Sequence, residues 1–151
     1  MKEDIANYPQ QILPAVAAAI FNDKGEILLQ KRKDVSQWCI ISGHVEFGET
    51  IEAAILREIE EETNVKANIT RFIGVYSSPA SQTYHYKDKI VQYVTSYFEA
   101  KLTDAIAPNF SNDETGELQF FNVENIPDDI ALINPNWLTD ALNNSSSVFI
   151  R

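Results

Sequence analysis

The sequence is poor in cysteine and has no long apolar run. Cys39 is the one cysteine among 151 residues, which excludes an intrachain disulfide and a cysteine-rich metal site. The apolar stretch 12–21 is interrupted by Pro14, whereas a transmembrane helix needs about 20 apolar residues. Glu3 and Asp4 lie where a secretory signal would be basic. We therefore expect a cytoplasmic protein with no membrane partner.

Positive charge is also scarce. The 12 Lys and Arg residues face 22 Asp and Glu residues, which gives a formal net charge of −10. Proteins that bind nucleic acids neutralise phosphates with Lys and Arg, so we expect no nucleic-acid partner. A small polyphosphate substrate is still compatible with this charge, because divalent cations can bridge carboxylates and phosphates.

The order of secondary structure predicts an α/β protein. We find no repeat, low-complexity linker or second domain, so residues 1–151 are expected to form one domain. Alternating apolar patterns and turn residues predict a hairpin of strands 15–21 and 26–31 around a turn at 22–25. Further predicted elements are a helix at 51–63 between an N-cap at Thr50 and an end at Asn64, strands at 71–76, 90–100 and 117–121, and a helix at 136–143.

The predicted central helix has an inward face that changes from apolar to acidic. At about 100° per residue, Glu58 and Glu62 lie on the apolar stripe, Glu61 lies beside it, and Glu60 points to solvent. The residues that form the apolar part of the stripe are Ile51, Ile55 and Ile59.

Carboxylates at this place oppose the helix dipole and repel one another, and burying one without a partner costs several kcal/mol. Arg57 is the one basic residue of the helix and can neutralise one acid. Two interpretations are compatible with the pattern: a solvated acidic surface, or a site for a hard divalent cation, which takes oxygen ligands.

The segment 43–65 resembles the Nudix box of the Nudix (MutT-like) hydrolases. That pattern is Gly, five residues, Glu, seven residues, Arg-Glu-apolar-x-Glu-Glu-x-Gly-apolar. This chain differs at the last glycine, which is Asn64, and has Ile40-Ile41-Ser42 where many relatives have Leu-Pro-Gly. The matching positions are Gly43, Glu49, Arg57, Glu58, Glu61 and Glu62.

The resemblance implies a fold, a cofactor and a reaction. The fold is an α/β/α sandwich around a mixed sheet. The cofactor is Mg²⁺ or Mn²⁺, with Glu58, Glu61 and Glu62 as ligands and the Ser42 carbonyl as a further one. The reaction is hydrolysis of a pyrophosphate linkage in a nucleoside diphosphate derivative.

The resemblance also implies how the site works. Glu58 is a ligand or the general base, and Glu49 supports the site from the preceding loop. Arg57 is expected to pair with a box carboxylate, foremost Glu61, and to orient it, because bidentate Arg–carboxylate pairs fix geometry well.

Outside the box the sequence offers weaker candidates. An acidic residue from a later loop serves as a further ligand in several relatives, and Glu114 is the first choice here, before Glu117. Arg32 suits a phosphate contact. Pro79 lies where some relatives acting on ADP-ribose carry a proline. The nucleobase could stack on one of three tyrosines, which are Tyr84, Tyr86 and Tyr93.

Two alternatives to this reaction remain at this point. One is a (d)NTP pyrophosphatase, which releases pyrophosphate. The other is a nucleotide-sensing domain without activity, although such a domain would normally have lost one of the box acids. The substrate is expected to be a small nucleotide, and a homodimer is left open.

Overall fold

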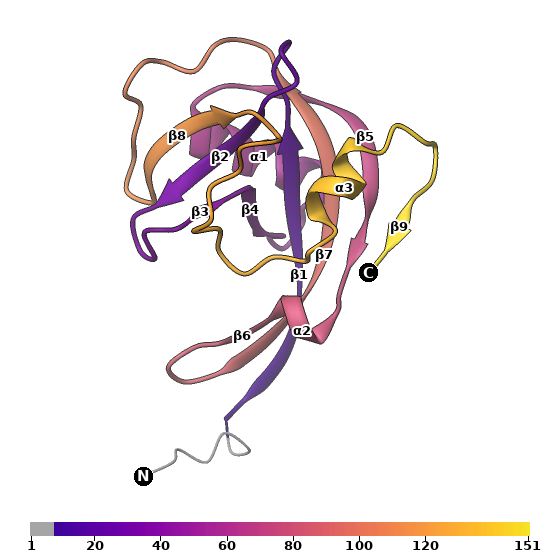
Figure 1. Ribbon diagram of the computed structural model, residues 1–151. Helices are drawn as coiled ribbons and strands as arrows, with labels where there is room; N and C mark the ends of the chain where they lie inside the picture. Colours follow the sequence, from indigo (N-terminus) through magenta and orange to yellow (C-terminus); the bar gives the residue numbers. More distant parts are fainter. Residues whose placement is uncertain (1–7) are drawn as a thin grey trace.

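The computed structural model describes residues 8–151 and is built around a mixed β-sheet (Figure 1). The order along this sheet is β4-β1-β7-β5-β9, and β6 pairs with β7 beside it. Strands β1 and β7 are parallel, as are β5 and β9, and the other pairs are antiparallel. The strands are β1 (Gln10–Ile20), β4 (Ile41–His44), β5 (Ala67–Tyr76), β6 (Thr83–His85), β7 (Ile90–Leu102) and β9 (Phe149–Ile150).

A second, smaller sheet has the order β3-β2-β8. Its strands are β2 (Ile27–Arg32), β3 (Trp38–Cys39) and β8 (Thr115–Phe121). The ladder between β2 and β8 is antiparallel, with an irregularity between Lys31 and Arg32 where Thr115 pairs. The start of β8 therefore lies beside the end of β2.

Helices α1 (Ile51–Thr63) and α3 (Trp137–Leu142) lie on opposite faces of the large sheet, whereas the single turn α2 (Pro79–Gln82) lies at one end of it, between β5 and β6 (Figure 1). Strand β1 serves both faces: Val16, Ala18 and Ile20 pack with α1, whereas Ala17 and Ala19 belong to the core that includes Trp137 of α3. The predicted α/β/α sandwich around a mixed sheet is confirmed.

Both ends of α1 form as predicted. The Thr50 hydroxyl accepts a hydrogen bond from the Ala53 N–H at 3.0 Å. Asn64 adopts the left-handed conformation, with φ of 57°, and its N–H donates to the Glu60 carbonyl. One expected core residue was wrong: Ile51 is 40% exposed, because the first turn of the helix emerges from the exposed box loop, and the buried face begins at Ala54.

The predicted hairpin of strands 15–21 and 26–31 is wrong. The turn forms, since the Asn22 side chain accepts from the N–H groups of Lys24 and Glu26. Beyond it, Phe21 and Ile27 make one isolated bridge and the strands then enter different sheets. The reason is that both edges of β1 are taken by β4 and β7. Local sequence favours a turn but carries no signal for these distant partners.

The carboxyl-terminal segment is attached to the large sheet through a buried aspartate, Asp140. Asp140 is 3% exposed, and its carboxylate accepts hydrogen bonds from Arg151 at 2.7 and 3.0 Å and from the Tyr76 hydroxyl at 2.5 Å. This contact joins α3 and β5 to Arg151, the residue that follows β9. The sequence did not predict β9. No helix among residues 8–151 is long and apolar enough to span a membrane.

We expect Asp140→Asn to lower the free energy of unfolding by about 2 kcal/mol, because Arg151 and Tyr76 lose a charged acceptor in a buried place. Urea denaturation followed by circular dichroism measures the loss. Asp23→Asn, which breaks the exposed pair with Lys101, is the control and should change little. Equal effects of the two substitutions would contradict a structural role for Asp140.

Candidate active site

The acidic end of α1 lies partly inside the protein. The Glu58 side chain is 13% exposed and Glu62 is 4% exposed as a residue, whereas the Glu61 side chain is 56% exposed. Glu60 is exposed, as the helical wheel predicted. Two of the predicted metal ligands are therefore shielded from water, and Glu61 lies at the rim.

Gly43 explains how Glu58 can lie so close to the sheet. The Glu58 carboxyl group occupies the space that a Cβ atom on Gly43 would need. Any larger residue at this position of β4 would push the carboxylate away. The box glycine is thus required for a close approach and not for a turn, since its φ is not positive. Ser42, whose carbonyl was a predicted ligand, is the adjacent residue of β4.

Arg57 connects the box loop to the helix. Its guanidinium donates two hydrogen bonds to Glu49, at 2.8 and 2.9 Å, one to Glu58 at 2.9 Å, and one to the His44 carbonyl at 3.0 Å. The predicted partner, Glu61, accepts the longest of these bonds, at 3.2 Å. The prediction that Glu61 is the foremost partner is wrong, because Glu49 offers both oxygens to the guanidinium fork. The Arg57 hydrogen bond lowers the pKa of Glu49, so this carboxylate stays ionised.

Glu62 has a different environment, with no basic partner among residues 8–151. Its carboxyl is hydrogen-bonded to the hydroxyl of Thr115, which is fully buried and also lies 2.8 Å from the Gln30 side chain. The Glu114 carboxyl lies close enough to Glu62 to interact with it. Burial raises the pKa of Glu62 to about 7, and the neighbouring Glu114 contributes in the same direction. Glu114, the predicted acid from a later loop, is therefore brought to the end of α1.

Glu58, Glu62 and Glu114 together suit a divalent cation. Burial raises the pKa of Glu58 although Arg57 acts against it, and Glu114 is close enough to contribute. Burial and the nearby Glu114 raise the pKa of Glu62, so Glu62 readily holds a proton in a place where a cation could replace it.

Among residues 8–151, no three His, Cys, Asp or Glu side chains lie close enough together to hold a metal ion by themselves. Mg²⁺ typically keeps waters and binds one or two carboxylates together with substrate phosphates.

Of the remaining predicted site residues, Arg32 lies near the carboxylates at the end of α1, whereas Glu117 and Pro79 do not contact them. Arg32 lies close enough to Glu114 to interact with it electrostatically, and it pairs with Asp34 at 2.6 Å. Glu117 is exposed on β8 opposite Lys31, and no contact joins it to the box acids. Pro79 is the exposed first residue of α2, and no contact described for it reaches the carboxylates.

An aromatic cluster next to the box was only partly predicted. The hydroxyl of buried Tyr93 lies 3.1 Å from Nε2 of His44 and 2.7 Å from the Tyr86 hydroxyl. The His44 and Tyr93 rings stack with centroids 5.3 Å apart, and Tyr84 packs edge-on against Tyr93. His44, the last residue of β4, is exposed and lies two positions from Glu46, and its carbonyl accepts the Arg57 hydrogen bond described above.

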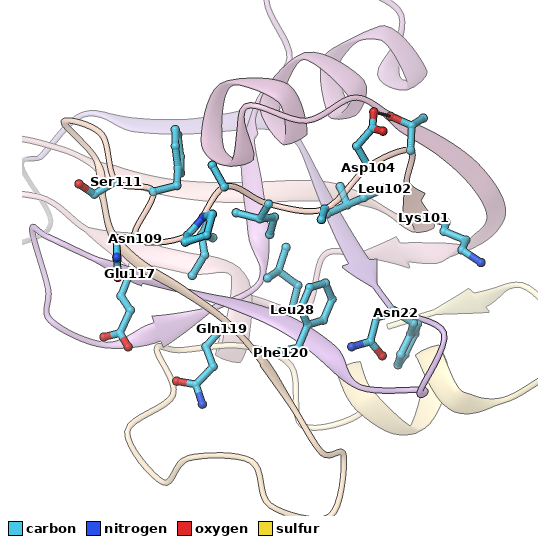
Figure 2. Close-up of a pocket in the computed structure, with 18 of the residues that line it drawn as sticks. Asn22, Leu28, Lys101, Leu102, Asp104, Asn109, Ser111, Glu117, Gln119 and Phe120 are labelled. Carbon is cyan, nitrogen blue, oxygen red and sulfur yellow. Dashed lines mark hydrogen bonds between the residues drawn. The ribbon is translucent and has the colours of Figure 1, made fainter.

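The large hollow of about 990 Å³ lies elsewhere (Figure 2). It is bordered by the turn at Asn22, by the loop after Leu102 and by β8 up to Phe120, and none of the box residues lines it. Figure 2 shows Glu117 at this hollow, which explains why the second-choice acid does not reach the site. The large hollow and the box carboxylates are therefore separate places in the protein.

Comparison with known proteins identifies the family. A family model described as the NUDIX domain matches residues 12–141. The chain belongs to the NUDIX family. The matched segment includes the box, the aromatic cluster and Glu114, so the resemblance seen in the sequence extends over most of the chain.

Curated Nudix relatives have several activities. An ADP-ribose pyrophosphatase of Methanocaldococcus jannaschii is 33% identical over 130 residues, which cover 83% of this chain and 72% of the relative. A putative 8-oxo-dGTP diphosphatase of Bacillus subtilis is 46% identical over 63 residues, covering 42% of each chain. A NAD-capped RNA hydrolase of Vibrio atlanticus is 29% identical, covering 81% of this chain but 41% of the relative. The predicted enzyme class, a Nudix pyrophosphohydrolase, is confirmed.

Solved structures support the same fold. A UDP-X diphosphatase matches with a TM-score of 0.72 and 29% identity, over 86% of this chain and 61% of that one. An ADP-ribose pyrophosphatase of Streptococcus suis matches with a TM-score of 0.69 over 92% of this chain and 97% of that one. The latter is 20% identical and bears on the fold alone.

We expect Gly43→Ala to displace Glu58 and to lower activity strongly while the protein still folds, because the added methyl group would occupy the place of the carboxyl. A steady-state assay and a thermal melt measure the two effects. Gly25→Ala is a control for loss of a glycine, since no atom lies near its Cβ position, although its positive φ should cost some stability. Full activity of Gly43→Ala would contradict the close approach.

We expect Glu62→Gln to be more stable than the wild type at pH 8 without metal, by about 2–3 kcal/mol for a pKa raised to about 7. The folded wild type takes up a proton as the pH falls from about 7 toward the ordinary value of 4.5, and the unfolded chain does not. Wild-type stability therefore rises over this window and the difference disappears near pH 5. Urea titrations in EDTA test this, with the exposed Glu60→Gln as control. A pH-independent difference would contradict the burial of an ionisable Glu62.

Proposed function

We propose that the protein hydrolyses a pyrophosphate linkage in a nucleoside diphosphate derivative with the help of Mg²⁺ or Mn²⁺. The observation that carries the proposal is that Glu114 lies close enough to Glu58 and Glu62 to raise the pKa of both, whereas the described cations nearby are Arg57, beside Glu58, and Arg32, near Glu114. Such a charge arrangement is costly by itself and is offset when a divalent cation binds.

The ligands proposed for this cation are Glu58, Glu61 and Glu62, with Glu114 and the Ser42 carbonyl as further ones. When bound, the metal neutralises phosphate charge, lowers the pKa of a bound water and stabilises the leaving phosphate. Glu61 lies at the exposed rim, so it is suited to a cation that also contacts the substrate.

Glu58 is the proposed general base. Its carboxyl lies between Arg57 and Gly43, which leave it little freedom to rotate. A base with a raised pKa accepts a proton from water more readily at neutral pH, and burial provides that shift. Glu49 and Arg57 contribute by holding the loop against the helix, so that the base keeps its orientation.

We further propose a small nucleotide substrate similar to ADP-ribose. The name of the Methanocaldococcus jannaschii relative supports this choice. Arg32 is the proposed phosphate contact, since it interacts electrostatically with Glu114 and with Tyr84 and Tyr93 of the aromatic cluster. The exposed rings of His44 and Tyr86, both held by the Tyr93 hydroxyl, offer a surface for a nucleobase. Pro79 is kept as a weaker candidate, supported by its position in the sequence alone.

A (d)NTP pyrophosphatase is the second candidate, because 63 residues of this chain are 46% identical to the putative 8-oxo-dGTP diphosphatase of Bacillus subtilis. The chain covers less than half of that relative and of the RNA hydrolase, so the activity of either whole protein is not carried over. A screen of ADP-ribose, nucleotide sugars, dinucleoside polyphosphates, NADH and (d)NTPs with Mg²⁺ or Mn²⁺ separates the candidates. AMP and ribose phosphate support the first proposal, whereas release of pyrophosphate supports the second.

We expect Glu58→Gln and Glu62→Gln each to lower kcat/KM on the best substrate by at least about 100-fold, because a lost ligand or base removes several kcal/mol of charge stabilisation. Glu60→Gln on the solvent face of the same helix is the matched control and should keep wild-type activity. Circular dichroism confirms that the variants fold. Near-wild-type turnover by Glu58→Gln or Glu62→Gln would remove the site assignment.

A further inference from the structure

Glu62 and Glu114 come from different elements, and two polar residues between them connect these elements. Glu62 is in the last turn of α1, and Glu114 ends the long loop between β7 and β8. Asn112 and Thr115 flank Glu114 in the sequence. Neither residue belongs to the box, and the sequence pattern did not single out their side chains.

Asn112 makes three side-chain hydrogen bonds, one to the helix and two to the backbone around Glu114. Its amide NH₂ donates to the Glu61 carbonyl at 2.9 Å, which is one of the helix-end carbonyls that lack a partner within the helix. Its side-chain oxygen accepts from the N–H groups of Glu114 at 2.9 Å and Thr115 at 2.7 Å. The same side chain therefore fixes the turn that carries Glu114 and attaches this turn to the end of α1.

Thr115 fixes the carboxylate itself. Its hydroxyl is fully buried and lies between Glu62 and the Gln30 side chain, and Gln30 is also buried. A hydroxyl has one hydrogen, and an ionised carboxylate is a stronger acceptor than a neutral amide. The hydroxyl therefore donates to Glu62 when that residue is ionised, as a metal ligand must be, and one oxygen of Glu62 is held in place.

We propose that Thr115 and Asn112 are positioning residues that hold Glu62 and Glu114 together at the end of α1 in the geometry that a divalent cation requires. The inference rests on the proposed function, because it assumes that these two carboxylates contact the metal. In this proposal, the loop between β7 and β8 places Glu114 beside Glu62. Partners that orient metal ligands commonly change metal affinity or activity by about 10–100-fold when they are lost.

The test is Mn²⁺ binding to the intact protein without substrate, measured by electron paramagnetic resonance. Thr115→Val keeps the shape of the side chain but removes the donor, and we expect it to weaken Mn²⁺ binding by about 10–100-fold. Thr115→Ser restores the hydroxyl and should recover most of the affinity. Asn112→Ala acts from a partly exposed place and should weaken binding by about 10-fold, so it tests the proposal even if Thr115→Val folds poorly.

The chain offers matched controls for both positions. Thr95 is also buried and hydrogen-bonded to a glutamine, Gln82, at 2.7 Å, so Thr95→Val removes a similar pair away from the box. Asn122 accepts from the Glu124 N–H in a similar turn after β8, so Asn122→Ala controls for the loss of an asparagine turn. Both controls should bind Mn²⁺ as the wild type does.

The outcomes distinguish this inference from the function on which it rests. Weak binding by Thr115→Val and Asn112→Ala, with recovery in Thr115→Ser, supports the proposal. If Glu62→Gln loses Mn²⁺ while Thr115→Val and Asn112→Ala bind as the wild type, the positioning role is overturned and the metal site stands. If Glu62→Gln itself binds Mn²⁺ normally, the assignment of Glu62 fails and the positioning role fails with it.

Discussion

The structure depends on two carboxylates, Glu58 and Glu62, that are largely shielded from water in the last turns of a helix, where their charge is unfavourable. Helix geometry places them on the same face as the apolar side chains of α1, so only a small part of each is exposed while Ile55 and Ile59 stay in the core. The protein stabilises the first with Arg57 and a close approach to Gly43. The second has a hydroxyl and a neighbouring acid, an arrangement that leaves a place for a cation.

The fold brings four segments to that place. Strand β4 supplies Gly43, the box loop supplies Glu49, and helix α1 supplies the acids. The second sheet brings Gln30 and Thr115 together because β2 and β8 pair there. Packing of α1 against β1 and β4 buries the helix face, and pairing of β1 with β7 places Tyr93 beside the box. The order of the strands in the two sheets thus brings together the aromatic cluster and the proposed metal ligands.

The box and the helix could be predicted from the sequence because their determinants are local. Thr50 caps the helix three residues before Ala53, Asn64 ends it, and the spacing of the acids fixes their face. The pairing of β1 depends on β7, about 80 residues away, and so the predicted hairpin was wrong. The supporting role of Glu49 was predicted, but its pairing with Arg57 was not. Spacing along a helix favours Glu61 as the partner of Arg57, whereas the conformation of the loop brings both oxygens of Glu49 to the guanidinium.

Thr115 and Gln30 gave no signal in the sequence, since a buried threonine on a strand is an ordinary core residue. Their role appears only when β2 and β8 are placed beside α1. Glu114, in contrast, could be proposed because the resemblance pointed to a later acidic loop. The acids of the box therefore come from one segment of the chain, whereas Thr115 and Gln30, which lie against Glu62, come from distant strands.

The most direct test is the proton balance of metal binding. If a cation replaces the proton that Glu62 holds, Mg²⁺ binding at pH 7 must release protons. Isothermal titration calorimetry in buffers with different ionisation enthalpies measures this release. We predict a release of about half a proton for the wild type, because the pKa of Glu62 is about 7, and a clearly smaller one for Glu62→Gln. Binding without proton release, or with the same release in both proteins, would contradict the account.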